Sequence, residues 1–133
     1  MEKEMLVSPK DESYSLDEVK ALCALSGDES VKARLCRMEK ALEGGERTKA
    51  LFFMPEATFG LFAAFNGCSA ICPFGIDDVR TMKEGLKAHE GEEGHKLILH
   101  LEKKLDVLER FILEGNAVVP VTIENDGFVA FNQ

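Results

Sequence analysis

The strongest apolar periodicity in the chain lies between His95 and Leu113. Apolar residues recur there at steps of three and four, which places them along one stripe of an α-helix. The stripe comprises Ile98, Leu101, Leu105, Leu108 and Ile112, and Leu97 and Phe111 widen it. Gly115 follows at the position where a glycine in the left-handed conformation commonly ends a helix. We predict a long helix that begins near Glu92 or Glu93 and continues to Leu113. Its stripe covers the core, with a seam between identical subunits as the alternative.

Two shorter helices are predicted near the N-terminus. Ser15, with Glu18 three residues later, matches a capping box at the start of a helix, and Ser26-Gly27 ends that helix. A second helix begins at Asp28 or Ser30 and ends at Gly44-Gly45. Its apolar stripe is Val31, Leu35, Met38 and Leu42. The pattern predicts a helical hairpin, preceded by a flexible arm at residues 1–14.

Short apolar runs near the middle and the end of the chain predict strands. The run of residues 50–54 is apolar and ends at Pro55, which suits a buried strand. Apolar runs also flank Asn125-Asp126-Gly127, a strong signal for a β-hairpin. Pro120 indicates that its strand lies at an edge at that point. We therefore expect a small antiparallel sheet.

The segment from Pro55 to Gly67 is ambiguous. As a helix it has proline in the first turn, Glu56 near the positive end and glycine as a cap. As a strand it would pair back on residues 50–54. A short similarity between residues 60–66 and 127–132 makes us favour the strand.

A further helix begins near Gly75, with Asp77 and Asp78 in its first turn. Its stripe is Val79, Met82 and Leu86. The glycines of His89–Gly94 interrupt it before the long helix begins. The fold we predict is α+β and forms a single domain over residues 15–133. It has an N-terminal helical hairpin, a small antiparallel sheet with a C-terminal β-hairpin, and two long helices packed on the sheet.

Charge and composition narrow the classes of partner. The chain has 133 residues and a net charge of −8, and no cluster of Lys and Arg. This argues against nucleic acid or an anionic membrane as a partner. The first residues lack the pattern of a secretory signal, and the longest weakly charged stretch is broken by prolines. We expect a cytoplasmic protein whose four cysteines are reduced thiols.

Cys68 and Cys72 are the candidate reactive residues. They are separated by three residues and precede the helix that begins near Ile76, whose positive end would stabilise a thiolate. A thiol-redox site or a metal site holding zinc or an iron–sulfur cluster is therefore one hypothesis. The alternative is that all four cysteines are small buried apolar residues. Nothing in the sequence brings Cys23 and Cys36 to the other pair.

The histidines give a weaker signal. Glu92 and His95 have the i, i+3 spacing of a di-iron helix, but a second such motif is missing. The segment of residues 89–95 could bind a divalent cation if it forms a loop. We expect a solvated turn there.

Phenylalanines are concentrated between residues 52 and 74, where they could form the core, a pocket for an apolar ligand or a surface for a partner. No nucleophile elbow, phosphate-binding loop, zinc-protease or dinucleotide motif is present in the sequence. We therefore expect a non-enzymatic binding or regulatory protein that needs no cofactor and forms a homodimer. A protein partner or small apolar ligand would bind a Phe-rich surface or pocket. The residues expected there are Phe53, Phe59, Phe62, Phe65 and Phe74.

Overall fold

The structure, a computed structural model, describes residues 13–44, 50–66, 73–89, 95–124 and 127–130. Its helices are α3 (Leu16–Leu25), α4 (Glu29–Gly44), α5 (Glu56–Asn66), α6 (Ile76–Ala88) and α7 (His95–Leu113). Its strands are β1 (Ser13–Ser15), β2 (Ala50–Pro55), β3 (Val118–Glu124) and β4 (Gly127–Ala130). This confirms the predicted α+β class, with the N-terminal helical hairpin and the C-terminal β-hairpin.

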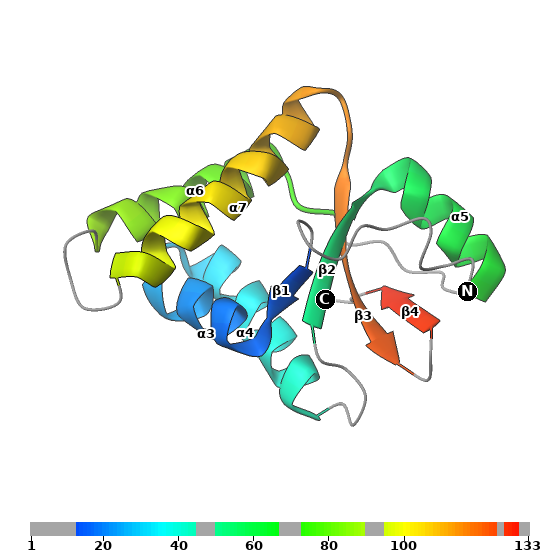
Figure 1. The fold of residues 1–133 in the computed structure, drawn as a ribbon, viewed down its shortest axis with the longest axis horizontal. Helices are drawn as coiled ribbons and strands as arrows, with labels where there is room; N and C mark the ends of the chain where they lie inside the picture. The colour runs from blue at the N-terminus through cyan, green and yellow to red at the C-terminus, as the bar shows by residue number, and fades with distance from the viewer. Residues whose placement is uncertain (1–12, 45–49, 67–72, 90–94, 125–126, 131–133) are drawn as a thin grey trace.

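The four strands form one antiparallel sheet in the order β1-β2-β3-β4. Helices α3, α4, α6 and α7 lie on one side of this sheet, and α5 lies on the other (Figure 1). The sheet is therefore the middle layer of the part of the chain that the structure describes.

Strand β2 contributes to a core on both of its faces, because successive side chains of a strand point to opposite sides. Leu51 and Phe53 belong to the larger core, between the sheet and the four helices. Phe52 and Met54 belong to a smaller core, which Phe59 of α5 completes from the other side. This arrangement explains the uninterrupted apolar run in β2, since a strand covered on both faces needs no polar alternation.

The favoured prediction of a strand over residues 55–66 was wrong, because these residues form helix α5. Phe59, Phe62 and Phe65 recur at steps of three, and Ala63 and Ala64 have high helix propensity. Strand β2 ends at Pro55, and Glu56 lies in the first turn of the helix. The similarity to residues 127–132 had no structural meaning, since only the later segment contains a strand.

The predicted N-terminal arm extended too far along the chain. Ser13 and Tyr14 belong to β1, where Tyr14 pairs with Leu51 of β2. The Tyr14 ring is buried and packs edge-on against Phe53, with the ring centroids 4.9 Å apart. A three-residue strand with one apolar residue is too short to show a periodicity. Residues 1–12, the rest of the predicted arm, lie outside the described residues.

Helix α7 ends at Leu113 as predicted, and the structure describes it from His95, whereas the predicted start near Glu92 or Glu93 lies outside the described residues. Ile98, Leu101, Leu105 and Leu108 of its stripe are buried. Leu97 was expected to widen the stripe but is 38% exposed. Gly115 ends the helix with a φ of 96°, which only glycine adopts at little cost.

Pro120 lies in an inner strand, and the described pairing of β3 with β4 begins at the next residue, Val121. The proline nitrogen has no hydrogen to donate to a neighbouring strand. Phe53 of β2 pairs with Pro120 on one side, and no described residue of β4 pairs with it on the other, which fits the prediction of an edge at that point.

Candidate functional site

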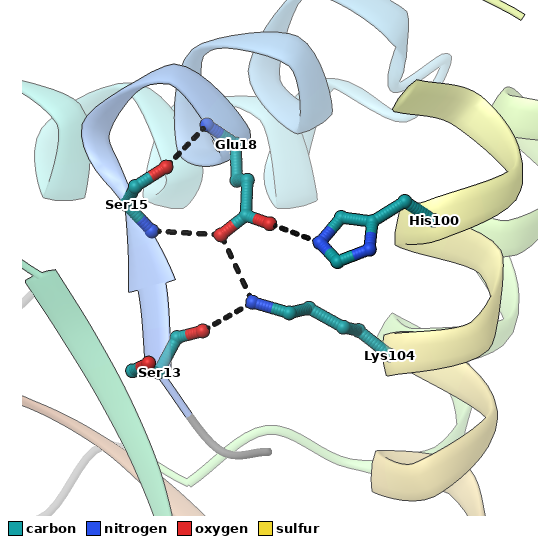
Figure 2. A network of polar contacts seen from close by, with 5 residues as sticks. All are labelled: Ser13, Ser15, Glu18, His100 and Lys104. Atoms are coloured by element: carbon teal, nitrogen blue, oxygen red, sulfur yellow. Dashed lines mark hydrogen bonds and ion pairs between the residues drawn. The ribbon is translucent and has the colours of Figure 1, made fainter. Parts of the chain in front are cut away.

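A network of polar side chains joins the start of α3 to α7, and Figure 2 shows it. The carboxylate of Glu18 accepts hydrogen bonds from the Ser15 backbone N–H at 2.9 Å and from Lys104 Nζ at 2.9 Å. Its second oxygen lies 2.6 Å from His100 Nε2. The Ser15 hydroxyl accepts from the Glu18 N–H at 3.3 Å, which completes the predicted capping box. One carboxylate thus caps α3 and holds two basic residues of α7.

Lys104 extends the network to the sheet. Its ammonium group donates to the Ser13 carbonyl in β1 and lies 4.7 Å from the centroid of the Tyr14 ring. A cation over the face of an aromatic ring is attracted by the ring's electron density. Lys104 therefore connects α7 with β1 and α3 at once.

The pKa values in the network follow from burial and from charge. Burial alone would raise the pKa of Glu18, but the Ser15 N–H, Lys104 and His100 together outweigh it and hold the pKa below its ordinary value of 4.5. Burial, assisted by the negative charge of Glu18, raises the pKa of the Tyr14 hydroxyl far above its ordinary value. The Tyr14 hydroxyl is buried and has no hydrogen-bond partner among the described residues.

The two buried charges of the network, on Glu18 and Lys104, compensate each other. The side chains of Glu18 and Lys104 are only 12% and 14% exposed, and each charge is compensated by the other. His100 is the accessible member, with a side chain 53% exposed. The described contacts of the network fasten α7 to the helical hairpin, and we assign it a structural role.

A second polar cluster fixes Phe74. The guanidinium of Arg34 lies 4.3 Å from the centroid of the Phe74 ring, forms an ion pair with Asp78 at 3.1 Å and donates to the Pro73 carbonyl at 3.3 Å. Asp78 also accepts from the Gly75 N–H at 2.9 Å at the start of α6. These contacts hold α4 against the start of α6 and keep Phe74 in the core.

Surface ion pairs link α6 to α7. Lys83 Nζ lies 2.6 Å from Asp106 and 2.7 Å from Glu109, and Arg80 lies 3.0 Å from Glu109. The hydrogen bonds to Asp106 and Glu109 raise the pKa of Lys83, and the bonds from Lys83 and Arg80 lower the pKa of Glu109. These pairs fix how the two helices pack.

Three of the five phenylalanines predicted to form a binding surface are core residues instead. Phe53, Phe59 and Phe74 are only 2%, 1% and 1% exposed. They fill the space between the sheet and the helices on its two faces, so none of them presents a surface to a partner. Phe62 and Phe65 lie on α5, but their side chains are outside the described part of the structure.

A cavity of about 500 Å³ opens between the α3–α4 turn and α6. Asp28, Thr81, Glu84 and His89 contribute its polar lining. Its described lining contains no phenylalanine, so it is not the Phe-lined pocket that we expected.

The outer face of α5 is apolar as well as the inner one. Its exposed residues at helical spacing are Ala57, Gly60, Leu61 and Ala64. Leu61 is 60% exposed. The sequence already indicates an apolar outer face, because Glu56 is the only charged residue of the helix. The prediction of a strand for these residues did not include such a face.

Cys68 and Cys72, the predicted metal or redox pair, lie outside the described residues. The structure brings the other two cysteines together, and Cys23 of α3 and Cys36 of α4 form a disulfide with a Cα–Cα distance of 5.7 Å. The expectation of four reduced thiols was therefore wrong for this pair. A carboxylate oxygen of Glu39 lies within 4.8 Å of both sulfurs. Both cysteines lie on predicted helices, but the packing of those helices cannot be deduced from their periodicity.

Comparisons of the chain with protein-family models, with curated proteins and with solved structures found no match. Among the described helices, none is both long enough and apolar enough to cross a bilayer.

Proposed function

We propose that this chain is a non-enzymatic binding protein that forms a homodimer through the outer face of α5. The observation that carries this proposal is the exposed apolar stripe of α5, which lies on the far side of the sheet from the other described helices (Figure 1). In this proposal the stripe, and not the predicted surface of phenylalanines, is the binding surface.

A helix that is apolar on all sides normally lies in a protein interior. The inner face of α5 has this environment, because Phe59 is buried against β2 and β3. The outer face carries Leu61, which is 60% exposed. Burying a leucine side chain completely stabilises a folded or associated state by roughly 1.5–3 kcal/mol. A contact that covers this face therefore gains this apolar burial.

Charge supports a second copy of the chain as the occupant. Each copy carries a net charge of −8, so two copies repel each other over most of their surfaces. The exposed stripe of α5 carries no charge, so it adds nothing to this repulsion when two copies meet there. Ala57, Gly60 and Ala64 are small, so two such helices can approach closely around a two-fold axis.

The remaining features of the proposal depend on the sequence alone. We propose that the dimer acts in the cytoplasm, needs no cofactor and binds a protein partner or a small apolar ligand. A thiol or metal function at Cys68 and Cys72 stays a prediction of the sequence.

Light scattering on size-exclusion chromatography tests the dimer. We expect the wild type to be a dimer at tens of micromolar and Leu61→Glu to be a monomer, because the variant places a charge in the contact. Leu113→Glu is the matched control, since Leu113 is 65% exposed at the end of α7, and this variant should stay dimeric. Circular dichroism verifies that both variants are folded. A monomeric wild type, or a dimeric Leu61→Glu, would exclude α5 as the contact.

A further inference from the structure

Three groups that can ligate a metal meet where α3 packs on α4. They are the sulfurs of Cys23 and Cys36 and a carboxylate oxygen of Glu39, and all three atoms lie within 4.8 Å of one another. This cluster lies on the opposite side of the sheet from α5, so it is independent of the proposed dimer contact (Figure 1).

The helices fix the geometry of the cluster. Cys36 and Glu39 are three residues apart on α4 and therefore share one face of that helix. Cys23 reaches them from α3, and an ion pair of 3.3 Å between Lys20 and Glu43 lies across the same pair of helices. The ligand-bearing backbones are thus held in place before any metal binds.

The site also accommodates a free thiol at Cys23. Its sulfur lies 3.7 Å from the carbonyl oxygen of Lys32, which is within reach of a thiol donor. Cys23 is buried, whereas Cys36 and Glu39 are partly exposed. The side of the cluster formed by the latter two residues is therefore open to water.

We propose that Cys23 and Cys36, when reduced, bind one Zn²⁺ together with Glu39. Two thiolates and a carboxylate are ordinary zinc ligands, and a water molecule on the open side would complete a tetrahedral site. Thiolates favour zinc over magnesium and calcium, which prefer oxygen ligands. The three negative charges of the ligands also attract the divalent cation.

Zinc and the disulfide exclude each other, because the same two sulfurs form both. A dithiol reductant opens the disulfide by two exchange steps, in which it transfers two electrons and two protons to the cysteines and becomes a cyclic disulfide itself. Zinc binding then releases the two thiol protons to solvent, while Glu39 binds as a carboxylate. The helical hairpin is thus crosslinked by a disulfide when oxidised and by zinc when reduced.

Cobalt titration of the reduced chain tests the site, because thiolate–Co²⁺ coordination produces charge-transfer absorption. The experiment uses Cys68→Ser/Cys72→Ser protein under anaerobic conditions, so that the only thiols present are Cys23 and Cys36. We expect one equivalent of Co²⁺ to bind, Zn²⁺ to displace it and about two protons to be released per zinc bound.

Two variants make the test specific to the proposed ligands. Glu39→Gln should weaken binding by roughly tenfold or more, whereas Glu29→Gln, which changes an exposed carboxylate in the first turn of the same helix, should bind as the parent does. Cys36→Ser should remove the charge-transfer absorption, and circular dichroism of the reduced proteins verifies the fold. Absence of thiolate absorption in the parent, or equal affinity of the Glu39→Gln and Glu29→Gln variants, would overturn the proposal.

Discussion

Glu18 and Lys104 are 86 positions apart in the chain, yet their charged atoms lie 2.9 Å apart in a largely buried ion pair (Figure 2). The pair joins the first turn of α3 to the middle of α7. It brings the helical hairpin and the long C-terminal helix into one layer over the sheet. The stability of that layer should therefore depend on each partner.

Removal of the ammonium group of Lys104 should destabilise the fold. Lys104→Met keeps most of the apolar stem but leaves the Glu18 carboxylate without its main cation and Ser13 without its donor. We expect a loss of roughly 1–3 kcal/mol in the free energy of unfolding, measured by urea denaturation. Lys103→Met, an exposed neighbour, is the control and should change it by less than about 0.5 kcal/mol. Equal effects of the two substitutions would contradict the role of the ion pair.

Glu18 should make the protein sensitive to acid. Its pKa is lower in the folded chain than its ordinary value of 4.5, so the unfolded chain binds the proton more tightly. The stability that the carboxylate provides is complete above about pH 4.5 and is lost as the pH falls through the lower folded value. Urea titrations at several acidic pH values should show a smaller loss for Glu18→Gln than for the wild type. Asp17→Asn removes a neighbouring exposed charge, and this variant should lose as much stability at acidic pH as the wild type does.

Tyr14 should behave in the opposite way at alkaline pH. Burial raises the pKa of its hydroxyl, so its contribution to stability is complete below the ordinary value of 10.0 and is lost above it. The chain has one tyrosine and no tryptophan, so tyrosinate absorbance reports this group alone. We expect the Tyr14 hydroxyl to stay protonated in the folded protein at pH 10 and to ionise only when the protein unfolds.

Tyr14→Phe provides the matching stability measurement. The hydroxyl has no partner among the described residues, and an unsatisfied buried polar group costs about 1–3 kcal/mol. Tyr14→Phe should therefore be at least as stable as the wild type at neutral pH and should lose less stability at alkaline pH. A destabilised Tyr14→Phe would show that the hydroxyl has a partner.

Gly85 should not tolerate a side chain. A Cβ atom at this position of α6 would lie 2.4 Å from the carbonyl oxygen of Leu25 at the end of α3. Because the obstacle is backbone, one of the helices has to move, and Gly85→Ala should cost roughly 1–3 kcal/mol. Gly44→Ala, where no atom lies within 4 Å of the added Cβ, should leave the melting temperature nearly unchanged. A tolerated Gly85→Ala would mean that α3 and α6 are further apart.

The sequence was most informative where an element has one apolar and one polar face. Helix α7 and its C-terminal end could be predicted, because Ile98, Leu101, Leu105 and Leu108 stand out against charged neighbours. The capping box of Ser15 and Glu18 likewise depends only on residues close in the chain. These local signals are sufficient because they act within one element.

The sequence was least informative where both faces of an element are apolar or where the decisive contact is distant. Helix α5 has no polar side to reveal its period, so its sequence resembles that of a buried strand. The disulfide depends on how α3 and α4 pack, and the requirement for glycine at position 85 depends on Leu25 of another helix. The apolar periodicity of one helix does not show how close it comes to another helix, so it could predict neither contact.

Cysteine crosslinking at α5 tests the proposed dimer contact most directly. In a chain with Cys68 and Cys72 replaced by serine, Ala64→Cys places a new thiol on the outer face of α5, and Ala41→Cys places one on the exposed face of α4 as a control. After mild oxidation, we predict a disulfide-linked dimer for Ala64→Cys and monomer for Ala41→Cys on a non-reducing gel. Monomer for Ala64→Cys, or equal crosslinking of both variants, would contradict a homodimer formed through α5.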